Sequence, residues 1–139
     1  MLVLAEEGDK PVLIADIAER HNLPKKFLEQ ILLDLKHHGL VQSRRGRSGG
    51  YALLKPASEI SFGQVVRIID GPLAPLPCLS KMAYRPCEDC PGEEACEIRR
   101  VFARTHQLTS DVLDSTTLAD AIAPAGARKA VAAERQEVA

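Results

Sequence analysis

Apolar residues between positions 2 and 21 recur at the spacing of short amphipathic helices. Residues 2–7 (LVLAEE) predict the end of one helix, which Gly8 closes. A second short helix is predicted over residues 14–21, and its apolar face carries Ile14, Ile17 and Ala18. Asn22-Leu23-Pro24 then interrupts the helical pattern, because a proline ring disfavours the α conformation at the preceding residue.

A longer helix is predicted from about Lys25 to His38, with Gly39 as its C-cap. Its apolar residues recur every three or four positions, so one face is expected to be buried. That face carries Phe27, Leu28, Ile31, Leu32 and Leu35. The residues that lie off this face, and are therefore expected to be accessible, are Lys25, Lys26, Glu29, Gln30 and Leu33.

Two short strand-like runs follow, residues 40–42 and 51–54, and eight residues (SRRGRSGG) join them. Glycines adopt the positive φ angles that a tight turn needs. The same turn contains Arg44, Arg45 and Arg47. The pattern therefore predicts a β-hairpin with a cationic tip.

The second half of the chain begins with another helical pattern and continues into a proline-rich stretch. Ser61 is placed to cap a helix over residues 62–70, which Gly71-Pro72 ends. Residues 71–91 contain five of the nine prolines and three of the four cysteines. Such a composition predicts a loop rather than regular structure.

A long amphipathic helix is predicted from about Glu93 to Asp114. Its apolar stripe consists of Ile98, Val101, Phe102, Leu108, Val112 and Leu113. Thr117 and Asp120 match a capping box for a last short turn. Residues 124–139 have few large apolar side chains and are expected to form a disordered tail.

The charge distribution changes the interpretation more than the overall composition does. The net charge is −1, yet residues 20–55 hold eight basic and two acidic side chains, a local charge of +6. Such a stretch suits a nucleic acid, although a solvated helix face has the same character. With two Tyr, three Phe and no Trp, the chain lacks the stacking platforms of single-strand binders.

No feature of the sequence directs it to a membrane or to export. No apolar run approaches the roughly 20 residues that cross a bilayer. The first residues have neither the basic region nor the cleavage pattern of a secretory signal. We therefore expect a cytoplasmic protein.

Two helices joined by a tight turn and followed by a glycine- and arginine-rich hairpin form the element order of a winged helix-turn-helix. In that fold the second helix presents its N-terminal end to the major groove while its other face packs on the core. The candidate DNA-binding residues are Lys25, Lys26, Glu29 and Gln30 on this helix, and Arg44, Arg45 and Arg47 in the hairpin. The alternative is a small helical domain with a positively charged loop, but the joint order favours binding to double-stranded DNA.

Four cysteines, Cys78, Cys87, Cys90 and Cys96, fall within 19 residues. Without an export signal, such a cluster predicts a metal or redox site rather than a disulfide framework. A Cys-x-x-Cys pair can place two thiolates on one metal, and nearby cysteines can complete four ligands for zinc or for an iron–sulfur cluster. Spacing alone does not distinguish a cluster, a zinc site, and thiols that form a disulfide on oxidation.

Several short motifs make the sequence similar to the winged-helix regulators of the IscR and NsrR type, over about residues 12–122. The motifs are Leu28–Gln30 (LEQ), Gly39–Val41 (GLV), Arg45–Tyr51 (RGRSGGY) and Ile69–Leu73 (IDGPL). Those regulators are repressors that respond to iron–sulfur clusters and nitric oxide. The resemblance implies base contacts by Glu29 and Gln30 and a minor-groove contact by Arg45. Glu29 suits this role because a carboxylate can accept a hydrogen bond from cytosine N4.

The chain departs from the family pattern on its predicted DNA side and at its start. Pro24-Lys25-Lys26 stands where many members carry serines, and Arg47-Ser48 where many have Pro-Gly. Both differences make the predicted DNA face more cationic. Members also carry further residues before the segment that matches Leu2, which complete the first helix. We therefore expect either a misassigned start codon or a form that lacks part of its core and binds DNA poorly.

The resemblance also implies an iron–sulfur cluster, of the two-iron two-sulfur type, in the cysteine loop. Cluster-binding members often show three cysteines at five-residue intervals, sometimes with a histidine three residues after the last. Cys90 and Cys96 keep that interval, whereas Cys87 is additional and Arg99 stands in place of the histidine. We take Cys78, Cys90 and Cys96 as ligands, with Cys87 as the fourth or as a substitute. The alternatives are zinc or no metal.

The sequence thus predicts a mainly α protein with a small β-wing. It divides into a winged helix-turn-helix (1–72), a cysteine-rich sensor loop (73–92) and a dimerisation helix with its cap (93–123). We expect a homodimeric DNA-binding repressor whose operator binding depends on the cluster or redox state of the loop. A small iron–sulfur electron carrier could use the same cysteines but would not need the arginine-rich hairpin. No convergent catalytic groups and no small-molecule substrate are indicated, so an enzyme is not predicted.

Overall fold

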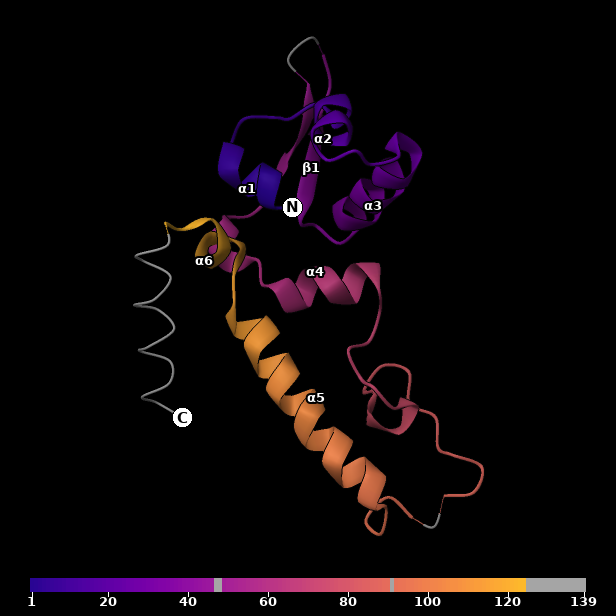
Figure 1. The fold of residues 1–139 in the computed structure, drawn as a ribbon. Coiled ribbons are helices and arrows are strands. Elements are labelled where there is room, and N and C mark those ends of the chain that lie inside the picture. Colours follow the sequence, from indigo (N-terminus) through magenta and orange to yellow (C-terminus); the bar gives the residue numbers. More distant parts are fainter. Residues whose placement is uncertain (47–48, 91, 125–139) are drawn as a thin grey trace.

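The computed structural model describes residues 1–46, 49–90 and 92–124 of the chain. These residues form a mainly helical protein with one two-stranded antiparallel sheet (Figure 1), which confirms the predicted fold class. No helix in these ranges is long and apolar enough to cross a membrane. The elements are α1 (Leu2–Glu7), α2 (Ile14–Arg20), α3 (Lys25–His37), β1 (Val41–Arg44), β2 (Gly50–Leu53), η1 (Ala57–Glu59), α4 (Phe62–Ile69), η2 (Pro77–Leu79), α5 (Glu97–Ser115) and α6 (Leu118–Ile122), where η1 and η2 are 3-10 turns.

A tight turn joins α2 to α3. Asn22 adopts a positive φ of 50°, a conformation that asparagine tolerates better than most residues. The Leu23 N–H donates to the Ala18 carbonyl at 2.9 Å and closes the turn. Pro24 is the N-cap residue of α3, where its missing N–H leaves no intrahelical hydrogen bond unmade. The turn therefore forms the helix-turn-helix that the sequence predicts.

The β1–β2 hairpin is the predicted wing. Its register runs from Val41 opposite Leu53 to Arg44 opposite Gly50. Val12 and Tyr51 form an additional bridge, with reciprocal N–H to carbonyl distances of 2.8 and 2.9 Å. Gly50 permits this close approach, because a Cβ there would lie 2.4 Å from the Val12 carbonyl oxygen. The wing is thus tied to the segment between α1 and α2.

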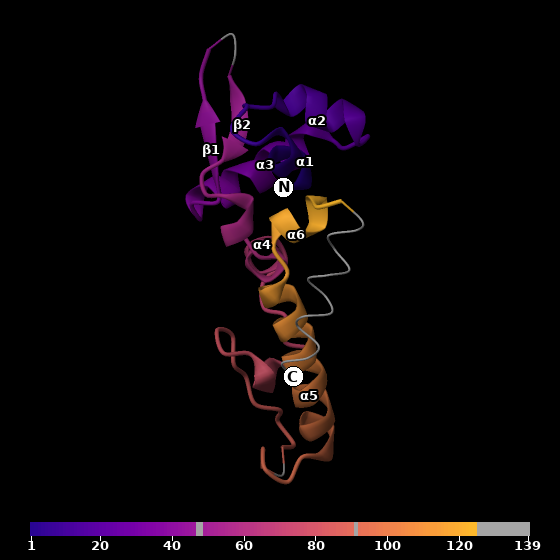
Figure 2. The ribbon, with the colours of Figure 1, turned by 90° about the vertical axis from the view of Figure 1, so that its left-hand side faces the viewer.

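The core of the winged half includes residues from both ends of the described chain. Leu4, Leu35 and Ile60 are almost fully buried, and Leu118, which is only 1% exposed, lies in the same core. The Leu118 N–H donates to the Ile60 carbonyl at 2.9 Å. The predicted capping box of Thr117 and Asp120 starts α6. The chain therefore leaves the winged half after α4, and α5 brings it back to that half (Figure 2).

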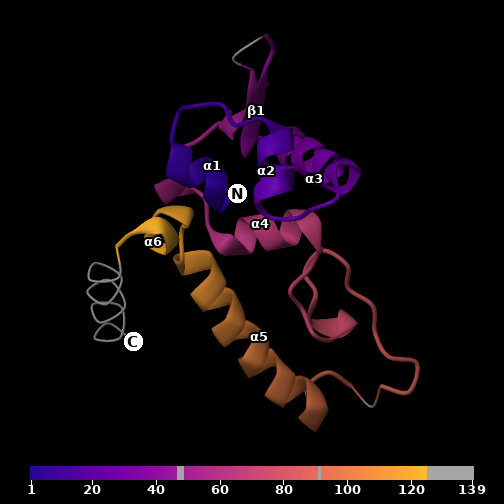
Figure 3. The same cartoon turned by 45° about the horizontal axis from the view of Figure 1, so that its top comes forward.

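α5 extends away from the winged half as a helix of 19 residues, none of which is buried (Figures 1 and 3). The segment between α4 and α5 runs beside the part of α5 that is far from the winged half. All four cysteines lie in this connection. The long helix thus links the cysteine-containing end of the molecule to the winged half.

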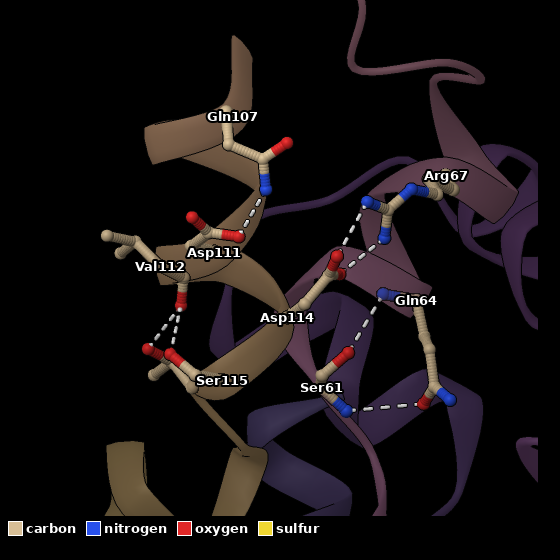
Figure 4. Close-up of polar contacts among 9 residues, drawn as sticks. Ser61, Gln64, Arg67, Gln107, Asp111, Val112, Asp114 and Ser115 are labelled. Atoms are coloured by element: carbon tan, nitrogen blue, oxygen red, sulfur yellow. Dashed lines mark hydrogen bonds and ion pairs between the residues drawn. The ribbon is translucent and has the colours of Figure 1, made fainter. Parts of the chain in front are cut away.

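A bidentate ion pair joins α4 to α5 close to the winged half (Figure 4). Arg67 Nη1 and Nη2 donate to Asp114 Oδ1 and Oδ2 at 2.5 and 2.9 Å. Gly63 leaves the space that this pair occupies, because a Cβ there would lie 1.9 Å from Asp114 Oδ1. The hydrogen bond from Arg67 lowers the pKa of Asp114 below its ordinary value. The Asp114 carboxylate is therefore ionised in this pair, and the pair stabilises the junction of the two helices.

Three details differ from the sequence prediction. α5 begins at Glu97 rather than Glu93, because Cys96 is its N-cap residue. Phe27, predicted on the buried face of α3, is 60% exposed, whereas Leu28, Leu32 and Leu35 of this helix are buried. The predicted loop contains the turn η2. The predicted tail lies outside the described residues from position 125 onward.

Candidate DNA interface and cysteine loop

The exposed side of α3 carries four of the predicted DNA-binding residues, Lys25, Lys26, Glu29 and Gln30. Within the described parts of the chain neither lysine forms an ion pair. Gln30 Nε2 donates to Asp34 Oδ1 at 3.1 Å, one turn along the helix. No side chain caps the N-terminus of α3, so its free N–H groups and the positive end of its dipole add to the charge of the lysines.

The wing places its arginines at its tip. Arg44 ends β1, Arg45 follows it, and both side chains are exposed. Gly46 adopts a φ of 110°, which supplies the positive angle expected of this turn. Arg47, the third predicted wing residue, lies outside the described residues. A cationic side chain at such a tip can reach phosphates or a narrow minor groove.

One hydrogen bond links the candidate recognition helix to the wing. Lys36 Nζ in α3 donates to Ser43 Oγ in β1 at 2.8 Å. Leu40 continues the link through the backbone, because its N–H donates to the Leu35 carbonyl at 3.0 Å. The lysines of α3 and the arginines of the wing are therefore carried by two elements in direct contact.

The four cysteines are all free thiols and differ in their exposure. Cys78 lies in η2 and is 8% exposed, Cys87 is exposed, and Cys90 is half-buried. Cys96, also half-buried, caps α5, and its Sγ accepts the Arg99 N–H at 3.4 Å. One thiol is thus part of the first turn of the long helix.

The thiols influence one another without forming a ligand group. Desolvation raises the pKa of Cys87, and the charges of Cys78, Cys90 and Cys96 and a hydrogen bond with Cys78 raise it further. Yet no three His, Cys, Asp or Glu side chains in the described ranges are grouped closely enough to hold a metal ion. The two observations are compatible, because the charge of one thiolate can shift the pKa of another thiol at a distance much longer than a metal–thiolate bond. The donor chemistry fits a soft metal or an iron–sulfur cluster, and binding would require the thiols to move closer together.

A polar network that the sequence analysis did not foresee braces the cysteine loop. Tyr84 donates its hydroxyl hydrogen to Glu93 Oε1 at 2.5 Å, and this bond raises the pKa of Tyr84. Glu93 Oε2 also pairs with Arg99 Nη2 at 2.8 Å. Arg99 thus connects the loop to the first turn of α5, at the position where the resemblance led us to look for a histidine. Spacing gave no signal for this network, because its members come from two separate parts of the loop and from α5.

A helix-turn-helix followed by a two-stranded wing, with cations on both that form no ion pair among the described residues, defines a winged helix-turn-helix DNA-binding protein. The comparison with protein families makes this class specific. A family model, Rrf2, described as an iron-dependent transcriptional regulator, matches residues 1–124. The chain therefore belongs to the Rrf2 family of transcription regulators, which confirms the resemblance found in the sequence.

Individual relatives agree with this assignment. An HTH-type transcriptional regulator of Rhodobacter capsulatus named rrf2-like is 53% identical over 127 residues, which cover 88% of this chain and 85% of the relative. The structure of CymR, the global cysteine regulator of B. subtilis, aligns with a TM-score of 0.69 and 32% identity, over 84% of this chain and 82% of that one. T. potens IscR aligns with a TM-score of 0.64 and 30% identity, over 87% and 76% of the two chains.

The family decides between the classes of function that the sequence analysis compared. Rrf2 proteins and the relatives named above are transcription regulators and not enzymes. The prediction of a DNA-binding regulator is therefore confirmed over that of an electron carrier or an enzyme.

Proposed function

We propose that this chain is a homodimeric repressor whose operator binding depends on an iron–sulfur cluster, of the two-iron two-sulfur type, in its cysteine loop. The observation that carries the proposal is the placement of all four cysteines in the connection between α4 and α5. Cys78, Cys90 and Cys96 are the favoured ligands, with Cys87 as the fourth or as a substitute. When bound, the cluster would supply a redox- and iron-sensitive centre.

DNA contact is assigned to the same residues as the sequence analysis proposed. Glu29 and Gln30 would read base edges, and Lys25 and Lys26 would hold phosphates beside them. Arg45 would enter the minor groove, and Arg44 and Arg47 would contact the backbone on either side. The contact between α3 and β1 supports this assignment, because it lets both elements meet one duplex together.

The long helix offers a physical route from the loop to the DNA. Cys96 caps the start of α5, and the chain after its end enters the core of the winged half through Leu118. A change in the loop that alters the first turn of α5 would therefore change the orientation of this helix relative to the winged half. In a dimer paired through α5, this change would alter the spacing of the two wings.

A thiol switch is the second candidate, and a specific observation favours it. The charge of Cys78 contributes to the raised pKa of Cys87, and no ligand group of three exists in the described ranges. Oxidation of two thiols would form a disulfide within residues 78–96 and release two electrons and two protons to an oxidant such as a peroxide. CymR, described as a cysteine regulator, is among the structures that align with this chain. A structural zinc site is the third possibility.

Anaerobic purification of the full chain separates these candidates. If the cluster is present, the protein is brown with visible absorbance, and Cys90→Ala is colourless yet folded. Met82→Ala, an exposed residue of the same loop, should keep the colour and serves as the matched control. One colourless zinc per chain would overturn the cluster proposal. Metal-free protein that forms a disulfide between any two of the cysteines within residues 78–96, and then changes its affinity for DNA, would assign the thiol switch.

A further inference from the structure

Phe27 is an exposed aromatic residue in the first turn of α3. It is the third residue of the helix, and 60% of its surface is exposed. Isolated exposed apolar residues are common and need no explanation by themselves. Phe27 differs because its neighbours on the accessible side of the same helix end are Lys25, Lys26, Glu29 and Gln30, the candidate DNA contacts.

The fold offers Phe27 no other role. The buried face of α3 is complete without it, because Leu28, Leu32 and Leu35 fill the core. The apolar stripe of α5 lies on the helix that extends away from the winged half, whereas α3 belongs to the winged half itself (Figures 1 and 3). The ring is therefore part of the candidate DNA face and not of the core or of the proposed dimer surface.

We propose that Phe27 reads the C5-methyl group of a thymine in the major groove. This inference rests on the DNA-binding function argued above. The thymine methyl is the one apolar group that a base pair presents there, and phenylalanine is among the side chains that contact it. The lysines beside the ring would hold it in place by neutralising phosphates. Among the described residues of the first two turns of α3, Phe27 alone combines an exposed side chain with an apolar one.

Helix geometry indicates where this thymine lies relative to the other bases. Phe27 and Gln30 are separated by three positions, so they are neighbours on the helix surface, with Cβ atoms about 5–6 Å apart. Successive base pairs are about 3.4 Å apart along the duplex axis. The thymine is therefore expected about one or two base pairs from the base that Gln30 reads.

Replacing thymidine with deoxyuridine tests this contact, because their bases, thymine and uracil, differ only in the methyl group. The probe is a duplex that the wild-type protein enriches from a random library, in which each thymine is replaced singly. We expect the dissociation constant, measured by fluorescence anisotropy, to rise about fourfold when the contacted thymine of a half-site is replaced. This change corresponds to the free energy gained by burying one methyl group. Phe27→Ala should bind the thymine duplex more weakly and should not distinguish the two bases at that position.

The comparison of two duplexes with one protein removes the effect of any general loss of folding. Phe27→Leu keeps an apolar side chain and should retain part of the discrimination. Leu54→Ala, an exposed apolar residue of the winged half outside α3, should show the wild-type pattern.

A wild-type protein that is insensitive to every deoxyuridine overturns the inference and leaves DNA binding intact. A Phe27→Ala variant whose response to each deoxyuridine matches that of the wild type also overturns the inference. The exposed ring would then be available to bind another protein. Failure of the wild-type protein to enrich any duplex would overturn the DNA-binding function together with this inference.

Discussion

Gly50 is the residue on which the attachment of the wing depends. It has a φ of 142°, and a Cβ at this position would lie 2.4 Å from a backbone oxygen of Val12. Gly46, in the same hairpin, also has a positive φ but has open space around it. Comparing alanine substitutions at the two glycines therefore separates the loss of stability from backbone strain from the loss caused by a steric clash.

We expect Gly50→Ala to lower the free energy of unfolding by about 3 kcal/mol, because the backbone at Val12 cannot move away without breaking its bridge to Tyr51. Gly46→Ala should cost only about 1 kcal/mol, from backbone strain alone. Urea denaturation followed by circular dichroism measures both values. Equal costs would show that the bridge yields easily and that the wing is less firmly attached than the hydrogen bonds indicate.

Arg45 is the wing residue whose predicted role is most specific. If it enters the minor groove, Arg45→Ala should weaken binding to the enriched duplex by about 1–3 kcal/mol at physiological salt. Fluorescence anisotropy on the enriched duplex and on an unrelated duplex measures the effect, and Arg104→Ala on α5 is the matched control. An unchanged affinity contradicts the assignment, whereas an equal loss on both duplexes would make Arg45 a phosphate contact.

At the scale of elements, the junction of α4 and α5 depends on the Arg67–Asp114 pair. The pKa of Asp114 is lower in the folded chain than its ordinary value of 3.8 because of its hydrogen bond from Arg67. The pair therefore adds stability that is fully present above about pH 4 and is lost as the pH falls through the lower, folded pKa. Both side chains are partly exposed, so the contribution is expected to be below about 1 kcal/mol.

Asp114→Asn should therefore lower the free energy of unfolding at pH 7, and the difference from the wild type should shrink below about pH 4. Denaturation curves across this range measure it. Asp111→Asn is the matched control, because Asp111 accepts its hydrogen bond from Gln107 within α5 and does not join the two helices. A difference that stays constant with pH would mean that the substitution acts through something other than the charge.

The elements that the sequence predicts well are those governed by local signals. The turn at Asn22 and Pro24, the Ser61 N-cap and the Thr117 capping box are each specified by a few neighbouring residues, and the structure contains all of them. The order of helix, turn, helix and hairpin was sufficient to indicate a DNA-binding fold, because each element supplies its own start and stop signals.

Features that depend on distant residues, or on an unusual capping residue, were missed. Phe27 follows the helical period of α3, but whether it is buried depends on how many neighbours the fold brings to that side, and periodicity does not report this. α5 starts four residues later than predicted because a thiol caps it, and cysteine is not a usual N-cap residue. The Tyr84–Glu93–Arg99 network depends on the path of a proline-rich loop, which has no sequence period.

At the scale of the whole molecule, α5 connects the two functional parts. Its 19 residues span about 28 Å, with Cys96 at one end and the return to the core through Leu118 just beyond the other. The side of α5 that faces α4 carries Asp114, which is held by the ion pair. The apolar stripe remains exposed, with Ile98, Val101, Phe102, Leu108 and Val112 between 40% and 62% exposed.

Pairing of two copies along this stripe would bury these side chains, so we expect a homodimer in solution. Phe102→Asp together with Leu108→Asp places two charges in the middle of the stripe, where pairing would have to desolvate them. The double variant should sediment as a folded monomer in analytical ultracentrifugation. It should also bind the enriched duplex far more weakly, because it loses the second recognition helix that the two-fold arrangement supplies.

Leu54→Asp with Met82→Asp is the control for this experiment, because both residues are exposed and apolar but lie outside α5. This variant adds the same charge and should remain dimeric. A Phe102→Asp, Leu108→Asp protein that still sediments as a dimer would place the interface on another surface. The route from the cysteine loop to the wings would then have to act within one chain, through the contacts of α5 with α4 and of α6 with the core.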